Sequence, residues 1–420
     1  MNSTPVIAHV LHSLDGGGTE RTLLALLRAF DPSRLRHVVV PLREAGSLAS
    51  RLPDHVACRP IRAKGKSRFT SLALGRTLRR AGASVVHARN SGTWVDSALA
   101  CLLEGRMNLV LGHHGLDLHD RFDRRARLRA KIGVWAGGRF TAVSRSAREQ
   151  LHQQARVPLQ RITILANGIE FARFAETSPS VRQAFREGIG IRPDDILVGI
   201  VGSLSPVKRH ELLFDAVAAL ASRTPNIKLV IAGDGPFRSD LERAAKTAGI
   251  AERTRFIGWI DDVPALLAAL DLFVCCSAAE GMSNAVLEAM AAGLPIVATA
   301  VGENAHLIRD GIEGCILTDP RPAFLSATME HLIRNPRAAR RLGEAARDRA
   351  RTFDFASAVA AYESYYERIV AGDASLRNAP STMQQPYGPI AYPPTCARPP
   401  RSAAAMRRVS RISRRQGVAH

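Results

Sequence analysis

Residues 272–290, LFVCCSAAEGMSNAVLEAM, join a short apolar run to a helical pattern through a loop that contains a glycine. The run 272–275 predicts a buried β-strand, because it is short and fully apolar. The residues after the loop are typical of a helix, whose first turn Ser283 or Asn284 can cap. A strand, a loop and a helix in this order form the unit from which helix-covered parallel sheets are built.

The same alternation of short apolar runs and amphipathic stretches extends over most of the 420 residues. It predicts an α/β fold, and it restarts after an irregular segment rich in proline and glycine. We therefore expect two doubly wound (Rossmann-like) domains that face each other across a cleft. The expected strands are 6–11, 37–41, 85–87, 109–112, 140–143 and 162–165 in the first domain, and 196–201, 228–232, 255–257, 272–275, 296–298 and 314–317 in the second.

These patterns also predict the domain boundaries. An N-terminal domain spans 1–170, a linker 171–195 and a C-terminal domain 196–353. A final helix at 354–372, capped by Asp354, is expected to pack back on the N-terminal domain. Residues 373–420 carry eight arginines, seven prolines and one aspartate, so we expect a disordered basic tail that cannot bury enough apolar surface to fold.

Composition limits the protein class without naming a partner. The formal net charge is +20, but only six of the 58 basic residues are lysines, so arginine-rich codon usage is a competing explanation. The six cysteines form no C-x-x-C pair, which favours a reducing compartment and no zinc site. No apolar stretch reaches about 18 residues, and the N-terminus lacks a basic leader, so we expect a cytoplasmic protein.

A glycine loop, Asp15 to Glu20, follows the strand expected at 6–11 and precedes a helical pattern. Gly17 and Gly18 would let backbone amides approach an anion at the start of that helix. The spacing is not G-x-G-x-x-G, and no acidic residue follows a second strand, so a dinucleotide site is not expected. A plain flexible turn is the alternative interpretation.

Three charged residues follow strands of the second domain. Lys208 lies at the mouth of the sheet, where a point charge suits a phosphate, although a solvated loop lysine remains the alternative. Glu280 and Glu288 would flank a helix N-terminus whose amides can hold a diphosphate. Alternatively, both carboxylates are structural, one in a loop and one in the favourable early part of a helix.

The stretch at 280–314, EGMSNAVLEAMAAGLPIVATAVGENAHLIRDGIEG, resembles the donor-site signature of the family-four, or group one, glycosyltransferases. The GGGTE, HARN and EGMSN variants are most similar to a subgroup of sugar transferases tied to bacterial exopolysaccharide systems. Supporting matches are GGGTER at 16–21, HARN at 87–90, HHGLD at 113–117, AVSRS at 142–146, ANGIE at 166–170, VGSLSPVK at 201–208, AGDGP at 232–236 and FIGWIDDVPALLAALDLFV at 256–274.

The resemblance implies a GT-B fold and a retaining transfer from a nucleotide sugar, a UDP- or GDP-sugar, without an obligatory metal or cofactor. The chain indeed contains no Asp-x-Asp triplet. Glu280 would contact the donor sugar, Glu288 the ribose and Lys208 the diphosphate. The catalytic residues implied are Glu280 and His114. The donor-binding residues implied are Gly17, Gly18, Ser203, Lys208, Arg209, Gly258, Trp259, Ile260, Gly281, Met282, Ser283, Asn284 and Glu288, and those on the acceptor side are Arg89, Asn90 and His113.

The chain departs from the family pattern at three positions. Ser203 stands where the family usually has an arginine that neutralises the diphosphate, and Arg209 would replace it if its side chain turns inward. Ser283 stands where many members have proline, and Glu303 stands where they have a second glycine. For His113 and His114, the alternative is a strand-end histidine satisfied by nearby backbone.

The acceptor implied is a glycan or a polyprenyl-linked sugar, and we expect no nucleic-acid partner. The alternatives are an epimerase-like enzyme that keeps the nucleotide site, and a basic non-catalytic protein that binds nucleic acid or a membrane. Residues 120–138 are rich in arginine, which suggests peripheral contact with an anionic membrane, at the inner face of the plasma membrane, or alternatively a plain surface helix. The apolar residues of this stretch are Phe122, Ala126, Leu128, Ile132 and Trp135.

Overall fold

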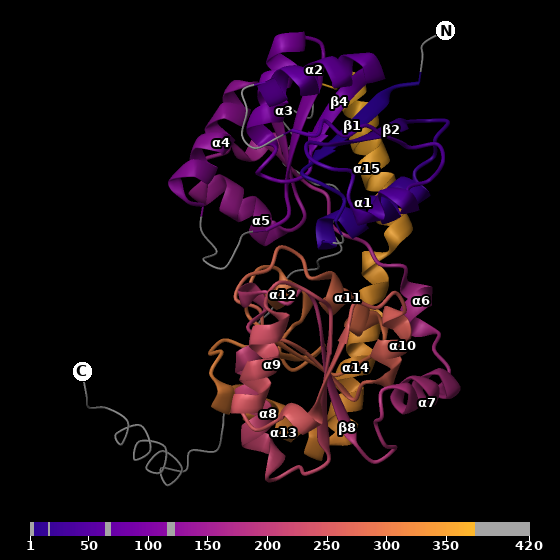
Figure 1. The fold of residues 1–420 in the computed structure, drawn as a ribbon, viewed down its shortest axis with the longest axis vertical. Coiled ribbons are helices and arrows are strands. Elements are labelled where there is room, and N and C mark those ends of the chain that lie inside the picture. Colours follow the sequence, from indigo (N-terminus) through magenta and orange to yellow (C-terminus); the bar gives the residue numbers. More distant parts are fainter. Residues whose placement is uncertain (1–3, 16, 64–68, 116–121, 374–420) are drawn as a thin grey trace, which may run out of the picture.

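The computed structural model of the chain describes residues 4–15, 17–63, 69–115 and 122–373. The prediction of a disordered tail therefore concerns residues outside the described ranges, apart from Asp373. The described ranges form two α/β halves, one above the other in Figure 1. None of their helices is both long and apolar enough to cross a bilayer.

The first domain is built on a seven-stranded parallel sheet in the order β3-β2-β1-β4-β5-β6-β7. The chain runs outward from β1 to β3 and then crosses back to β4, so the sheet is doubly wound. Its strands are β1 (Val6–Leu11), β2 (Arg36–Pro41), β3 (Ala57–Cys58), β4 (Ala83–Ala88), β5 (Asn108–His113), β6 (Arg139–Ala142) and β7 (Ile162–Ile164).

Helices cover both faces of this sheet (Figure 1). Alternate residues of a strand point to opposite faces, so Ala8 and Val10 of β1 join the core under α2 to α4, whereas Ile7 and Leu11 join the core under α1 and α15. The helices and helical turns of this half are α1 (Gly18–Ala29), η1 (Ser47–Arg51), α2 (Phe69–Ala81), α3 (Trp94–Glu104), α4 (Arg124–Trp135), α5 (Arg145–Glu149), η2 (Gln150–Gln154) and η3 (Leu159–Arg161).

The second domain has a six-stranded parallel sheet in the order β10-β9-β8-β11-β12-β13. The strand order reverses between β8 and β11, which places the loops after these two strands side by side. The strands are β8 (Ile196–Val201), β9 (Ile227–Ala232), β10 (Thr254–Gly258), β11 (Leu272–Cys275), β12 (Ile296–Thr299) and β13 (Cys315–Leu317).

The helices of the second half follow its strands in the predicted alternation. The two sheets and the helices that cover them confirm the predicted α/β class of two doubly wound domains. The helices and helical turns of the second half are η4 (Pro206–Lys208), α8 (His210–Ala221), α9 (Arg238–Thr247), η5 (Ala251–Arg253), α10 (Val263–Ala269), α11 (Asn284–Ala291), α12 (Asn304–Leu307), α13 (Pro322–Arg334), α14 (Pro336–Ala350) and η6 (Arg351–Phe353).

The segment that we expected to be an irregular linker contains two helices, α6 (Phe171–Ala175) and α7 (Pro179–Gly188). Both pack on the second domain, against α10. Arg186 of α7 is almost fully buried and donates to the backbone oxygen of Ala269 at 2.9 Å and to the Asp271 carboxylate at 3.2 Å. The buried arginine thus donates hydrogen bonds to polar groups at the end of α10 and just before β11. The segment is therefore part of the second domain's surface.

The last helix, α15 (Phe355–Val370), returns to the first domain (Figure 1). Asp354 caps it by accepting from Ser357 N at 3.0 Å. Glu363 accepts from Arg34 at 2.6 Å and from the Asp31 backbone at 2.9 Å. The aromatic side of α15 joins the core under β1 and α1, so the chain crosses between the domains twice.

Candidate functional site

Loops that follow β5 and β11 touch across the domain interface. A side chain on Gly281 would place its Cβ 1.9 Å from the His114 backbone oxygen, and one on Gly115 would lie 2.6 Å from Gly281 N. Gly115 also has a φ of +111°, which side chains rarely adopt. Both positions therefore require glycine, and they bring the His114 loop onto the loop that begins at Glu280.

Lys208 and Glu280 form an ion pair between the loops after β8 and β11. Lys208 Nζ lies 2.5 Å from Glu280 Oε1, and Ser277 Oγ donates to the same oxygen at 2.7 Å. Burial alone would lower the pKa of Lys208, but the charge and hydrogen bond of Glu280, together with Cys275 and Cys276, hold this pKa above its usual value. Lys208 is therefore a cation held in a fixed position beside the carboxyl ends of the strands of the second sheet.

Helix α11 begins at the interface and contacts the first domain. Ser283, one of the two residues expected to cap it, does so by accepting from Val286 N at 3.4 Å. Asn284 Nδ2 donates to Thr22 Oγ1 of α1 at 3.1 Å, and Asn284 Oδ1 accepts from Asn167 at 2.8 Å. The N-terminal turns of α1 and α11 thus meet, and both present the positive end of a helix dipole to the same region.

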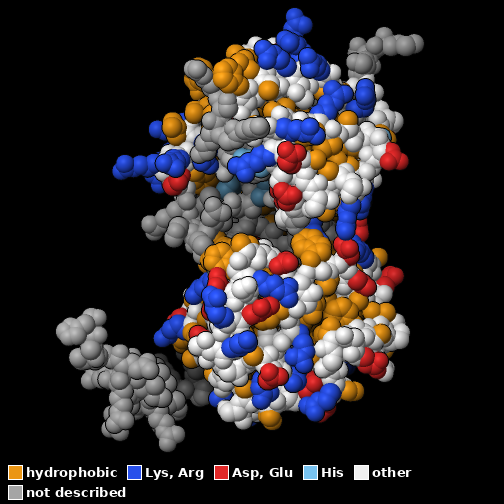
Figure 2. All heavy atoms as spheres, in the orientation of Figure 1, with side chains coloured by type: hydrophobic (Ala, Val, Ile, Leu, Met, Phe, Trp, Pro, Cys, Tyr) orange, Lys and Arg blue, Asp and Glu red, His pale blue; other side chains and the backbone are white. Residues whose placement is uncertain are grey.

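The residues expected to meet the base lie beside a cavity between the domains. Trp259 follows β10 and is 44% exposed, and the guanidinium carbon of Arg21 lies 3.3 Å from the centroid of its ring. The cavity has a volume of about 310 Å³, at the waist that Figure 2 shows hollowed between the two halves. It is lined by Asp15, Ser47, Leu48, Arg51 and Trp259.

Arg51 lines this cavity, and the charge of Glu288 acts on Arg21, which stacks on Trp259 at the same cavity. Arg51 Nη1 lies 2.9 Å from Asp261 Oδ1 and links the domains at the surface. Burial raises the pKa of Glu288 on α11 to about 7, although the positive charges of Arg21 and Arg173 oppose the rise. The charge of Glu288 therefore acts on Arg21, whose guanidinium stacks on Trp259.

Glu303 also bridges the domains, at a position where the family usually has glycine. Its side chain is fully buried, and Glu303 Oε2 accepts from Ser146 N at 3.0 Å. Ser146 Oγ donates to the Gly302 backbone oxygen at 2.7 Å. A Cβ on Gly302 would lie 1.9 Å from the Glu280 backbone oxygen, so this contact reaches the loop of the predicted catalytic carboxylate.

The two histidines after β5 differ in their surroundings. His113 is buried and contacts Gln150 at 3.3 Å, with the Phe122 ring 5.2 Å away, so its surroundings fit a packing role. His114 is half-buried, and burial, followed by Arg89 and His113, lowers its pKa to about 3. His114 is therefore neutral near pH 7 and can offer a hydrogen bond but no charge.

The structure does not bring Arg89 to the acceptor side, where we expected it. Arg89 is 2% exposed and points into the core, where its guanidinium contacts His9 Nδ1 at 3.1 Å and Tyr366 Oη at 3.3 Å. Burial, followed by the charge of Arg89, holds the pKa of His9 well below its usual value. The neighbouring Asn90 stays at the loop, where Thr93 Oγ1 donates to its backbone oxygen at 2.9 Å.

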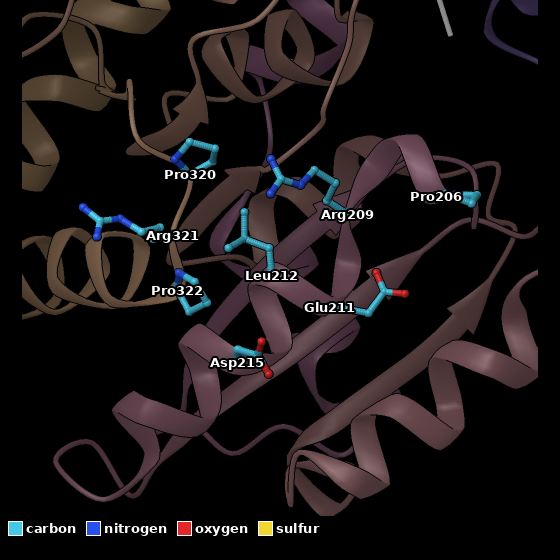
Figure 3. Close-up of a pocket in the computed structure, with 8 residues that line it drawn as sticks. All are labelled: Pro206, Arg209, Glu211, Leu212, Asp215, Pro320, Arg321 and Pro322. Atoms are coloured by element: carbon cyan, nitrogen blue, oxygen red, sulfur yellow. The ribbon is translucent and has the colours of Figure 1, made fainter. Parts of the chain in front are cut away.

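Arg209 lies outside this set of contacts. Its side chain reaches toward Pro320 over Leu212 in a cavity of about 470 Å³ on the second domain (Figure 3). None of the other residues that line this cavity belongs to the predicted donor site. Ser203 is exposed, and its hydroxyl group lies 3.0 Å from that of Ser205, so this position offers a hydroxyl group and no positive charge.

The remaining predicted residues lie at the interface or beside it. Gly17 caps α1 and Gly18 begins it, and both are exposed. Met282 is buried, Gly258 accepts from Gly233 N at 2.7 Å, and Ile260 packs on the core. In the ranges that the structure describes, no group of three or more histidine, cysteine or acidic side chains could hold a metal ion.

Sequence reasoning did not single out Arg21, Thr22, Ser146, Asn167 or Glu303 as site residues. The first four lie in or next to the GGGTER, AVSRS and ANGIE stretches. These stretches indicated which loops belong to the site, but they did not indicate which side chains make the contacts. Their roles depend on the approach of the second domain, which a single sequence does not show.

Comparison with known families matches both halves of the chain. Residues 16–173 match the model of "Glycosyltransferase Family 4", and residues 181–349 match that of "Glycosyl transferases group 1". Among named relatives, EpsD of Bacillus subtilis, named as a glycosyltransferase, is 31% identical over 50% of this chain and 55% of its own length. The two models together cover most of both domains.

A second relative and a solved structure extend these matches. The Escherichia coli UDP-Gal:alpha-D-GlcNAc-diphosphoundecaprenol alpha-1,3-galactosyltransferase is 26% identical over 66% of this chain and 74% of its own length. The structure of Anabaena HepE in complex with UDP-glucose superposes with a TM-score of 0.76, at 22% identity, over 87% of this chain and 99% of HepE. At that identity the structural likeness bears on the fold alone.

Proposed function

This chain belongs to the group 1 glycosyltransferases and has their GT-B fold, and on that premise we propose that it transfers a sugar from a nucleotide-sugar donor to a lipid-linked or glycan acceptor. The observation that carries the proposal is the Lys208–Glu280 pair at 2.5 Å, beside the start of α11. It joins a cation suited to a diphosphate to a carboxylate suited to sugar hydroxyls. A donor that enters would take over both partners of this pair.

The leaving diphosphate would be stabilised by groups that are already in place. Lys208 supplies a charge, and the first turns of α1 and α11 supply backbone amides near Gly18 and Asn284. Negative charge grows on the diphosphate as its bond to the sugar breaks. Fixed donors aimed at developing charge contribute most to rate, because they need no reorganisation during the reaction.

We propose that the donor is a UDP-sugar. The Escherichia coli relative is named for UDP-Gal, and the HepE structure holds UDP-glucose. In this chain Glu288 would accept from the ribose hydroxyls, and the backbone from Gly258 to Ile260 would contact the base beside Trp259. The stack of Arg21 on Trp259 would close the base site from the first domain.

The proposed transfer retains the configuration at the anomeric carbon. The bond from this carbon to the phosphate oxygen breaks, and the acceptor oxygen bonds to the same face. The acceptor proton passes to the departing phosphate oxygen. Glu280 is tied to Lys208 and Ser277, so it is placed to hold the sugar hydroxyls while His114, which is neutral, lies on the adjoining loop.

The name of one relative supports the proposed acceptor class. The Escherichia coli relative is named for a diphosphoundecaprenol-linked acceptor, which supports a polyprenyl-linked acceptor and a role in exopolysaccharide or other cell-surface polysaccharide synthesis. Such an acceptor is held in a bilayer, so the enzyme would work at the inner face of the plasma membrane.

A thermal-shift panel tests the donor assignment. UDP, GDP and ADP, each with and without its sugar, are added to the full chain at equal concentrations. A ligand that binds only the folded protein raises its unfolding temperature by mass action. UDP should raise it most, and the shift should fall in Lys208→Ala but not in Lys246→Ala, which changes an exposed lysine of α9. Equal shifts from all three nucleotides would contradict the UDP assignment.

A further inference from the structure

Helices α2, α3 and α4 leave large hydrophobic side chains exposed on the outside of the first domain. Phe69 is 63% exposed, Leu103 61%, Leu128 58% and Trp135 75%. Of the twelve large hydrophobic side chains that are exposed among the described residues, seven lie on these helices. Single exposed hydrophobic residues are normal, but a group on adjoining helices indicates a contact surface. The other three are Leu72, Leu99 and Leu102.

The three helices adjoin one another. Ser71 of α2 donates to Asp96 of α3 at 2.8 Å, and Arg79 Nη1 lies 3.1 Å from Glu104 Oε2. Helix α3 in turn packs on α4. We call the outward sides of α2, α3 and α4 the three-helix face. Hydrophobic and basic side chains gather at the upper left margin of Figure 2, where Figure 1 places these helices.

The three-helix face is strongly positive. The three helices contain eight basic residues and two acidic ones. Both acidic side chains are engaged inside the helix pair, Asp96 with Ser71 and Glu104 with Arg79. The outward charge is therefore almost entirely basic. The basic residues are Arg76, Arg79, Arg80, Arg124, Arg125, Arg127, Arg129 and Lys131.

The partner of the three-helix face should offer both negative charge and an apolar region over a broad surface. An anionic bilayer presents negative headgroups above hydrocarbon, so basic side chains can stay at the headgroups while apolar tips enter below them. A nucleic acid would neutralise the arginines but would gain little from exposed leucines. The charge and the apolar residues together therefore favour an anionic membrane.

The sequence suggested a membrane contact through residues 120–138 alone, but α4 forms only part of the exposed hydrophobic surface. Phe122 is 2% exposed, and Ala126 and Ile132 pack against the domain core. Gly133 lets α4 approach the sheet, because a Cβ there would lie 2.2 Å from a methyl group of Leu111. Most apolar residues of α4 thus face inward, and the outward apolar surface comes mainly from α2 and α3.

We propose that the three-helix face docks the protein on an anionic bilayer, with the outward leucines, Phe69 and Trp135 at the headgroup boundary. Helix α4 begins nine residues after Gly115, which touches Gly281 in the donor site. Docking would thus hold the acceptor side of the interface near the membrane. Its purpose rests on the proposed function, whereas the binding itself does not.

Vesicle co-sedimentation of the full chain tests the proposal. The vesicles contain either phosphatidylcholine alone or phosphatidylcholine with 30% phosphatidylglycerol, at low and high salt. One variant replaces Leu103, Leu128 and Trp135 with serine, and another replaces Arg124, Arg125 and Arg127 with serine. The matched controls replace Val181 and Phe237, and separately Arg337, Arg340 and Arg341, with serine on exposed sites of the second domain.

The native chain should bind anionic vesicles, and salt should weaken the binding. Loss of the three arginines should reduce partitioning by about 100-fold, because each basic residue near the surface contributes about fivefold. Loss of the three apolar residues should reduce it by about tenfold or more. The control variants should stay within about twofold of the native chain. The basic tail is present in every variant, so its contribution cancels.

The proposal is overturned if the three-helix variants bind like the native chain, or if the controls lose binding equally. Equal binding to neutral vesicles would also overturn it, because it would remove the role of charge. Vesicle binding without sugar transfer would uphold docking and contradict the proposed function. Sugar transfer with no vesicle binding would do the reverse.

Discussion

Lys208 Nζ lies 2.5 Å from Glu280 Oε1, and Ser277 Oγ holds the same carboxylate oxygen. The pair fixes both side chains at the ends of β8 and β11, where the strand order of the second sheet reverses. In the proposed donor complex, the diphosphate would replace the carboxylate as the partner of Lys208, and the sugar hydroxyls would replace the ammonium as partners of Glu280. Under this proposal, the donor competes with the resting ion pair.

Lys208→Ala should weaken binding of UDP by about 1.5–3 kcal/mol, the range for one hydrogen bond to a charged group. Isothermal titration calorimetry measures this directly. Lys246→Ala, on the exposed side of α9, is the matched control and should bind UDP as the native chain does. Equal affinities for native and Lys208→Ala would show that the lysine is only part of the resting ion pair.

Glu288 should make stability depend on pH. Its pKa is raised by burial to about 7, so the folded protein holds this proton more tightly than the unfolded chain. The free energy of unfolding should therefore decrease as the pH rises from about 5 to 8. In urea denaturation, the free energy of unfolding of Glu288→Gln should decrease less with rising pH than that of the native chain or of Glu252→Gln. Identical pH profiles for all three proteins would refute the assignment.

Activity should survive removal of divalent metal. The positive charge at the diphosphate is assigned to Lys208 and to the first turns of α1 and α11, whose amides can replace a cation. Turnover should change by less than about twofold after dialysis against EDTA. Complete loss that magnesium or manganese restores would contradict this account of the leaving group.

Tyr366→Phe should destabilise the contact of α15 with the first domain. Tyr366 Oη lies 2.8 Å from His87 Nδ1 and 3.3 Å from Arg89 Nη2, so its removal leaves buried polar groups without a partner. The free energy of unfolding should fall by about 1–3 kcal/mol in urea titrations. Tyr362→Phe, on the same helix beside Phe30, should lower the free energy of unfolding by less. An unchanged stability of Tyr366→Phe would contradict the packing described.

Local patterns in the sequence were enough to predict most strands and two helix caps. The runs 6–11, 196–201 and 272–275 match β1, β8 and β11, because buried parallel strands are short and apolar on both faces. The structure adds β3 (Ala57–Cys58), which has only two residues at the edge of the sheet and leaves no periodic signal. Asp354 was predicted as a cap, and Ser283 as one of two candidate caps, because the residues after them have helical patterns.

Residues that depend on distant parts of the chain could not be placed from the sequence. Arg89 points into the core because α15, some 280 positions later, supplies Tyr366. Arg21 meets Trp259 only through the approach of the two domains. The outward leucines of α2 and α3 look like ordinary core positions until the sheet defines which side of each helix is covered. In each case the missing information is a tertiary contact.

The most direct test of the central claim is transfer of labelled sugar by Glu280→Gln. The full chain is incubated with the radiolabelled UDP-sugar that gives the largest thermal shift and with a polyprenyl-diphosphate-linked sugar, and label in the lipid phase is counted. The native chain and Glu252→Gln, an exposed control, should transfer at equal rates. Glu280→Gln should remain folded and lose about 10³-fold or more, as expected for a group that acts at the transition state. Near-native transfer by Glu280→Gln would contradict the assignment of this site.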